Sequence, residues 1–286
     1  MVVPLRRAVW FAISLLAVVA LLPVSASASA LLQGDYLQVG VSDSGGLIDD
    51  AFTAGVNLDP AGGGAYTAAD FLRPGTPFEF YSIGVGGVSI GAAGYALGNP
   101  FTGLTTDTTW GTQLTADTSA RWDGLGIYQN AWFDTTESRI HFVVTLTNTR
   151  APGSAPFTDV VYARGADPDQ DLYTYGTYFT YNSIDSSGVT AVGPYSGWSM
   201  KLIDTWGGGN YSVSAPWETD PYALLTAGND GNGDYTINAA WDLGTIAPGT
   251  SKSVSFDYEF KAPGVPAFAL VGAAPVLGAL IRRRKR

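Results

Sequence analysis

Residues 139–171 read RIHFVVTLTNTRAPGSAPFTDVVYARGADPDQD, and this stretch decides the fold class. Apolar side chains at alternate positions from Ile140 to Leu146 form the period-2 pattern of a strand with one buried face. A loop with Asn, two prolines and a Gly follows at 148–156, and residues 157–164 form a second strand that is apolar on both faces. An acidic run, 167–171, ends the stretch. We expect these two strands to be the central pair of a β-sandwich.

The rest of the body repeats this alternation of strands and turns. Lys252–Phe260 alternates throughout, and no segment shows a convincing 3.6-residue period. Regular strands without helices predict an all-β fold, an antiparallel β-sandwich or supersandwich, in one domain over residues 31–262. Some local expectations are more specific. They comprise a turn at Thr118–Arg121 and strands at Tyr173–Tyr181 and Tyr222–Thr226.

The N-terminal end, residues 1–30, has the three parts of a secretory signal. Two arginines, Arg6 and Arg7, precede an apolar run, Trp10–Leu22, which is expected to form a signal helix. Small residues at Ala28 and Ala30 each complete a cleavage pattern, so the mature chain is expected to start at Ser29 or Leu31. The sequence therefore predicts export.

The C-terminal end, residues 263–286, carries an apolar run followed by a cluster of cations. The run Ala267–Ile281 is expected to be a hydrophobic transmembrane helix, although it is shorter than the roughly 20 residues of a full span. Terminal basic residues, among them Arg282, Arg283 and Arg284, would stay on the cytoplasmic side. A plain membrane tail remains an alternative to a processed signal.

This end resembles the C-terminal sorting signals of the PEP-CTERM group, which exosortase-type transpeptidases process. The resemblance covers Val265–Arg286 and departs from the best-known pattern, because Val265-Pro266 is followed by Ala267-Phe268 rather than Glu-Pro. It implies a bacterial cell-envelope protein, associated with exopolysaccharide, whose partners are a sorting transpeptidase and the membrane.

Charge and cysteine content narrow the possible partners. Between the termini, 8 basic residues stand against 25 acidic ones, which gives a net charge of −17. Such a surface repels nucleic acid and attracts cations, and it also keeps an exported protein soluble. The chain has no Cys, so its stability must come from its core. We expect no nucleic-acid partner.

Two acidic groups offer oxygen ligands at alternate positions. Asp167, Asp169 and Asp171 form the first group, and Asp230, Asn232 and Asp234 form the second. In a loop, this spacing can surround Ca²⁺ with carboxylates, while carbonyls and water complete six to eight oxygens. A polar turn is the alternative, and the Asp-Gly and Asn-Gly pairs of the second group favour it there. Ca²⁺ is the one cofactor expected.

Aromatic residues gather among glycine-rich loops near the end of the body. Trp198, Trp206 and Trp217 are candidates for stacking on sugars, since loops at the rim of a sandwich often carry binding surfaces. Core packing is the alternative for most of these rings. Trp206, beside three glycines, is expected to be the most exposed.

Little in the sequence points to catalysis. The only histidine, His141, lies on the less apolar face of its strand, where a surface or cross-strand role is expected. With one His and no Cys, zinc sites of the His/Cys type and Cys nucleophiles are excluded. We therefore expect no catalytic residue and no enzyme.

The body is also faintly similar to the galactose mutarotase-like supersandwich. The similarity is carried by a strand ending in Thr147-Asn148-Thr149, a loop, the strand Thr158–Arg164 and a polar rim. It implies a sheet that faces carbohydrate. No catalytic residue is carried over, because the His pair of an active mutarotase is missing.

These observations leave two functional hypotheses. The main one is a non-catalytic surface protein of the envelope or matrix, structural or adhesive, which contacts glycans and is stiffened by Ca²⁺. The alternative is a carbohydrate-active enzyme on a supersandwich fold. A concave sheet lined by Trp, a carboxylate pair and an Arg such as Arg164 would favour the enzyme. A flat polar surface with buried aromatics would favour the structural protein.

Overall fold

The computed structural model describes residues 29–66 and 69–263. In this part of the chain nearly all regular structure is antiparallel strand, which confirms the predicted all-β sandwich. The predicted signal helix and C-terminal hydrophobic helix lie outside the described residues. No helix among residues 29–66 and 69–263 is long and apolar enough to cross a membrane.

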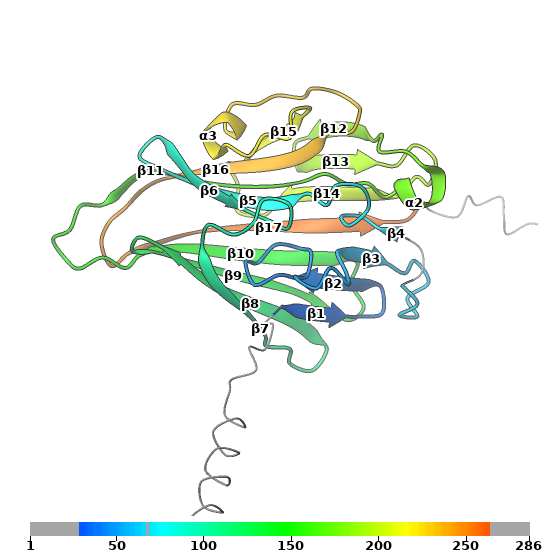
Figure 1. Ribbon diagram of the computed structural model, residues 1–286, viewed down its shortest axis with the longest axis horizontal. Helices are drawn as coiled ribbons and strands as arrows, with labels where there is room; N and C mark the ends of the chain where they lie inside the picture. Colours follow the sequence, from blue (N-terminus) through cyan, green and yellow to red (C-terminus); the bar gives the residue numbers. More distant parts are fainter. Residues whose placement is uncertain (1–28, 67–68, 264–286) are drawn as a thin grey trace, which may run out of the picture.

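An eight-stranded sheet forms one layer of the molecule (Figure 1). In spatial order its strands are β12 (Tyr181–Asp185), β13 (Gly188–Val192), β14 (Ser199–Asp204), β17 (Ser251–Lys261), β10 (Arg139–Asn148), β9 (Leu125–Asp134), β8 (Gln113–Trp122) and β7 (Thr102–Asp107).

Two smaller sheets cover the inner face of this large sheet. The five-stranded sheet has the order β15 (Asn210–Ser214), β16 (Thr236–Ile246), β11 (Phe157–Ala166), β5 (Glu79–Val85) and β6 (Val88–Ala93). The four-stranded sheet has the order β1 (Ala30–Gln33), β2 (Leu37–Val41), β3 (Val56–Leu58) and β4 (Ala69–Asp70). The two predicted central strands, β10 and β11, therefore lie inside opposite layers.

The core between the layers follows the predicted alternation. The even-numbered residues of β10 from Ile140 to Leu146 are buried, and so are those of β17 from Val254 to Phe260. The ring of Phe256 stacks on Phe142 of the same sheet (centroids 4.8 Å apart) and on Trp241 of the opposite layer (5.3 Å). Aromatic packing thus joins the sheets across the core.

A buried ion pair crosses the same core. Arg164 on β11 donates from Nε to Glu79 Oε1 (2.5 Å) and from Nη1 to Gln129 Oε1 (3.0 Å). Its side chain is fully buried. The guanidinium also lies 4.6 Å from the ring centroid of Phe142, on the large sheet. Burial raises the pKa of Glu79, while the positive charge of Arg164 opposes that rise. Arg164 is therefore part of the core and does not line a sugar-facing surface.

Three local predictions are wrong. The expected turn at Thr118–Arg121 is part of β8, and the chain reverses at Asp123-Gly124, where both residues have positive φ (38° and 82°). This two-residue Asp-Gly loop is a strong hairpin signal, because both positions need positive φ.

The other two corrections replace expected strands by single helical turns. The expected strand Tyr173–Tyr181 overlaps α2 (Leu172–Tyr175), which ends at Gly176 in the left-handed conformation (φ 69°). The expected strand Tyr222–Thr226 overlaps α3 (Pro221–Leu224). The Asp220 carboxylate accepts a hydrogen bond from the Tyr222 N–H (3.0 Å), and Pro221 occupies the first helical position.

Candidate functional site

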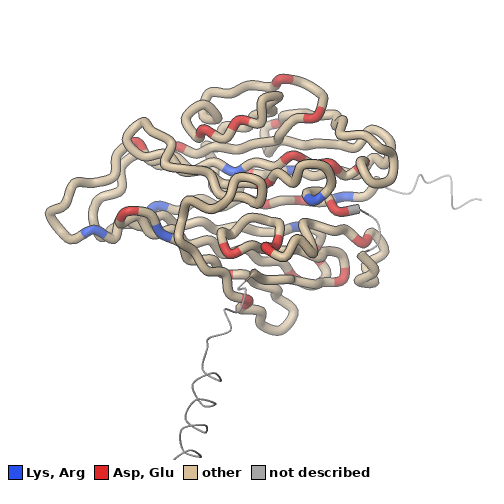
Figure 2. The backbone as a smooth tube through the Cα atoms, in the orientation of Figure 1, with Lys and Arg blue, Asp and Glu red and all other residues tan. Residues whose placement is uncertain are grey.

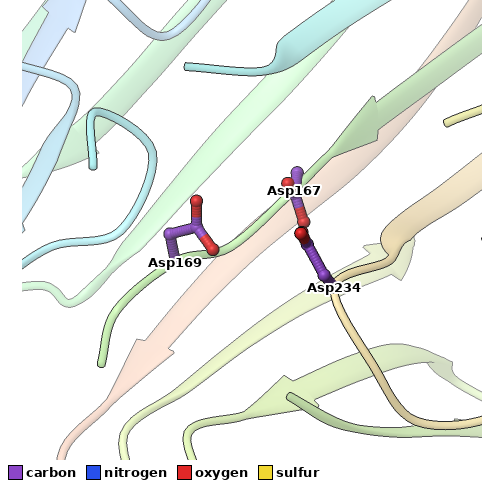
Figure 3. Close-up of side chains that lie close together, drawn as sticks. All are labelled: Asp167, Asp169 and Asp234. Atoms are coloured by element: carbon purple, nitrogen blue, oxygen red, sulfur yellow. The ribbon is translucent and has the colours of Figure 1, made fainter. Parts of the chain in front are cut away.

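Three carboxylates meet where β11 ends and β16 begins. Asp167 and Asp169 follow β11, and Asp234 precedes β16. Because Ala166 pairs with Ile237, the end of one strand lies beside the start of the other. Figure 3 shows the three side chains together, and one oxygen of each lies within 4.8 Å of the others. We call these three residues the acidic cluster.

The acidic cluster takes members from both predicted groups, which the structure merges into one. The local spacing i, i+2 brought Asp167 and Asp169 together, but no local pattern could add Asp234. Strand pairing between β11 and β16 supplies it.

Burial strongly affects two of the three carboxyl groups. Asp167 and Asp169 are each only 2% exposed, whereas Asp234 is exposed. Burial, together with the charges of Asp169 and Asp234, raises the pKa of Asp167 to about 9. Burial and the charge of Asp234 raise the pKa of Asp169 to about 8. Without a cation, burial and mutual repulsion therefore favour the protonated form of both groups.

The remaining predicted ligands have structural roles elsewhere. Asp171 Oδ2 accepts hydrogen bonds from the backbone N–H groups of Tyr195 (2.8 Å) and Ser196 (3.2 Å). Asp230 accepts one from the Ala215 N–H (2.9 Å), and Asn232 accepts one from the Asn182 N–H (2.7 Å). These three side chains fix loops, and the structure does not place them in the acidic cluster.

The three predicted tryptophans lie apart and differ in exposure. Trp198 is half-buried and stacks on Phe71 (5.9 Å between centroids). Trp217 packs on Phe78 (5.2 Å), and its Nε1 donates to the backbone oxygen of Asp234 (3.3 Å), beside the acidic cluster. Trp206 is 50% exposed.

A second group of rings, which the sequence analysis did not identify as a surface, is more exposed. We call it the aromatic rim, and its members are Tyr173, Tyr175, Tyr178, Phe179, Tyr181 and Tyr195, all at least 40% exposed. The rim adjoins the acidic cluster, because Thr180 and Gly233 exchange two backbone hydrogen bonds (2.9 and 3.1 Å). The sequence feature that could have indicated the aromatic rim is the run of tyrosines in Tyr173–Tyr181, which we interpreted as the composition of a strand.

A polar constellation on the outer face of the large sheet surrounds His141. In the register, His141 is opposite Asp257 of β17 on one side and Trp132 of β9 on the other. His141 Nδ1 lies 2.8 Å from Asp257 Oδ1, its Nε2 lies 3.6 Å from Glu137 Oε2, and Trp132 stacks on its ring (4.2 Å). Arg139, two residues before His141 on the same strand, forms salt bridges with Asp257 and with Glu259, which lies opposite it on β17. His141, Asp257, Glu137, Trp132 and Arg139 form what we call the His141 cluster.

The His141 cluster combines an accessible imidazole with carboxylates. The His141 side chain is 22% exposed and that of Glu137 is 38% exposed, while Asp257 is almost fully buried. The hydrogen bond to Asp257 is the main cause that raises the pKa of His141, against partial burial and the charge of Arg139. An imidazole held by one carboxylate and facing another is suited to general acid–base work. Sequence alternation placed His141 outward but could not supply the register that pairs it with Asp257.

The His141 cluster, the aromatic rim and the acidic cluster lie toward the same end of the sandwich. β17 ends there at Lys261, opposite Ser199, and β10 begins there at Arg139, opposite Glu259. Figure 1 shows α2 at this end, next to the tip of β17. In Figure 2, acidic residues are spread over both layers and their loops, so the negative charge is not confined to this end.

Comparison of the sequence with protein-family models and with curated proteins gives no match. Solved structures do match. A bacterial glucoamylase complexed with acarbose has a TM-score of 0.53 at 11% identity over 83% of this chain. A protein of Escherichia coli K12 assigned as an aldose 1-epimerase has a TM-score of 0.45 at 11% identity, over 82% of this chain and 99% of its own. The α-galactosidase AgaA of Geobacillus stearothermophilus has a TM-score of 0.42 at 9% identity, over 82% of this chain and 41% of its own.

The likeness to the glucoamylase shows that the two proteins share the fold of the β-sandwich. This chain covers 33% of the length of that enzyme.

The expectation of a protein that is not an enzyme needs correction. The solved structures similar to this chain are mostly carbohydrate-active enzymes, among them the glucoamylase, the α-galactosidase and an α-mannosidase of Enterococcus faecalis. Because the glucoamylase that shares the fold is an enzyme, the expectation that this chain is not an enzyme no longer stands; at 11% identity the likeness itself shows the fold alone.

Proposed function

We propose that the protein is an exported carbohydrate-active enzyme whose reaction takes place at the His141 cluster. The observation that carries the proposal is the accessible imidazole held between Asp257 and Glu137 on an open sheet face, with Trp132 stacked on it. The fold supports the choice of substrate class, because the glucoamylase that shares it acts as an enzyme and was solved with acarbose.

The cluster supplies a general acid for cleavage of a glycosidic bond. Asp257 orients the His141 ring through Nδ1, so Nε2 faces outward toward Glu137. His141, protonated, would donate its Nε2 proton to the glycosidic oxygen as the bond between that oxygen and the anomeric carbon breaks. Glu137 lies too close to Nε2 to act as a base on the opposite face of the sugar, so its carboxylate would stabilise the protonated ring. A water oxygen bonds to the anomeric carbon and loses its proton to solvent, and His141 regains a proton from solvent.

The aromatic rim supports binding of a long substrate at the same end of the sandwich. Tyr175 stacks on Tyr195 (5.5 Å) and Phe179 meets Tyr181 edge to face (5.4 Å), so these rings are held in place. Exposed rings that are pre-ordered can stack on sugar faces at low entropic cost. A polysaccharide is therefore the substrate class that fits the surface best.

The test is to incubate the purified protein with a panel of neutral and acidic polysaccharides and to measure new reducing ends. The variant His141→Gln should lower the rate by a factor of about 10² to 10⁴, the usual contribution of a general acid. Because the acid form of His141 is the active one, the rate should fall as pH rises through a pKa above the ordinary value of 6.5.

The matched control is Thr147→Val, which removes a polar group from the same face of β10 away from the cluster. It should leave the rate unchanged. Equal rates for the wild-type protein and His141→Gln would reject the site. A wild-type protein that changes no polysaccharide of the panel would reject the enzyme.

The proposed location is the bacterial cell envelope. The protein would be exported and then anchored by a membrane tail or attached by a sorting transpeptidase. Residues 1–30 and the segment Val265–Arg286 support this proposal through their composition. Cleavage after Ala28 fits the fold better than cleavage after Ala30, since Ala30 is 4% exposed and belongs to β1, where it pairs with Val41 of β2.

We therefore predict that the mature chain isolated from its native host begins at Ser29. N-terminal mass spectrometry checks this, and the C-terminal peptide of the same sample reports whether the sequence after Val265-Pro266 has been removed. An intact Met1 in protein recovered from the cytosol would contradict export.

A further inference from the structure

The donor set of the acidic cluster selects for a hard cation. All three side chains are carboxylates, the chain has no Cys, and its single His lies in the His141 cluster. Oxygen-only sites suit Ca²⁺ and Mg²⁺, whereas zinc and copper prefer imidazole or thiolate ligands. Two buried carboxylates and one exposed carboxylate make an asymmetric site that is open to water on one side. Ca²⁺ accepts such irregular geometry, whereas Mg²⁺ requires a near-ideal octahedron.

Unpaired buried oxygens form the second observation. Oδ2 of Asp167 and Oδ1 of Asp169 are buried and have no hydrogen-bond partner among the described residues. Both side chains are 98% removed from solvent, and Figure 3 shows Asp167 directed at Asp234. Buried polar atoms are nearly always paired, and an unpaired one costs about 1–3 kcal/mol. Ionised carboxylates that face one another offer no donors. Either shared protons or a cation can therefore satisfy these oxygens, and a cation is the one partner that can contact all three side chains at once.

We propose that Asp167, Asp169 and Asp234 bind one Ca²⁺ ion, which ties the end of β11 to the start of β16. Backbone oxygens and water would complete the coordination. The ion would also order the aromatic rim. Gly233, which directly precedes Asp234, is hydrogen-bonded through its backbone to Thr180, which lies between Phe179 and Tyr181 of the rim. This site does not depend on the proposed function, so either proposal can fail without the other.

The first experiment measures the melting temperature of the purified full chain in EDTA and in millimolar Ca²⁺. An ion at 100-fold its dissociation constant should raise the melting temperature by roughly 5–10 °C. Tb³⁺ should replace Ca²⁺ and show emission upon excitation of indole, because Trp217 donates a hydrogen bond to the backbone of Asp234. Added Ca²⁺ should quench that emission, and Mg²⁺ at the same concentration should not.

The variants distinguish the site from general binding to an acidic surface. Because Asp234 is exposed, the variant Asp234→Asn should fold, and it should lose most of the Ca²⁺-dependent shift in melting temperature. Asp167→Asn should lose it as well, whatever its melting temperature in EDTA. The control Asp230→Asn keeps the oxygen that accepts from Ala215 and should shift as the wild-type protein does.

Equal melting temperatures in EDTA and Ca²⁺ for the wild-type protein, with no sensitised Tb³⁺ emission, would overturn the proposal. In that case the two buried carboxyls are protonated partners of one another. A shift that survives in Asp234→Asn and in Asp167→Asn would place the ion elsewhere and would also overturn it.

Discussion

Replacing Arg164 by Met is expected to lower the free energy of unfolding by about 3–5 kcal/mol, because it leaves Glu79 as a buried charge without its partner. Arg164 and Glu79 are both fully buried, and the same guanidinium also donates to Gln129 and to the backbone oxygen of Gly45 (3.2 Å). Chemical denaturation gives the free energy, and for a body of this size the melting temperature should fall by roughly 10 °C.

The matched double variant shows whether the unpaired charge is the cause. Adding Glu79→Leu to Arg164→Met removes both charges and should restore a large part of the lost stability, as buried ion pairs often can be replaced by apolar residues. The surface control is Lys201→Met, which breaks the exposed pair with Asp185 and should cost at most about 1 kcal/mol. An unchanged stability of Arg164→Met would show that the core pair contributes nothing.

Truncation of Phe256 to Ala is expected to cost about 3–5 kcal/mol, the range for a large aromatic residue in a core that cannot collapse. Phe256 stacks on Phe142 within the large sheet and on Trp241 across the core, and it contacts Tyr162 of β11 (6.3 Å). The cavity would open between the two layers, where both walls are sheets. Denaturant unfolding measures the loss.

The control is Phe179→Ala, the same change at a ring that is 40% exposed on the aromatic rim. It should alter the free energy of unfolding by less than about 0.5 kcal/mol, as surface substitutions usually do. Equal losses at Phe179 and Phe256 would contradict the assignment of Phe256 to the centre of the core.

The sequence predicted which faces of the strands are buried, but not how the strands are ordered. Alternation from Ile140 to Leu146 and from Val254 to Phe260 is a local property that follows from the two-residue period. The pairing of His141 with Asp257 depends on the register between strands over a hundred residues apart. No local pattern encodes it, which is why His141 was predicted as a surface or cross-strand residue without an assigned partner.

The candidate sites show the same limit. Asp167 and Asp169 were found by local spacing, and Asp234 was assigned to a separate group. The missing information was the pairing of β11 with β16. The two helical turns were missed for another reason: α2 and α3 are four residues each, too short to show a helical period, and only the cap signals at Asp220-Pro221 and Gly176 were available.

The place of β17 has a consequence for the biogenesis of the protein. This strand is the last in the described chain, yet it lies between β14 and β10, inside the large sheet. During synthesis or passage through a translocase, the middle of that sheet stays open until Lys261 has emerged. Such a high contact order slows folding. If the chain is exported as proposed, it would therefore remain unfolded during translocation and complete its large sheet only after almost the whole body has crossed.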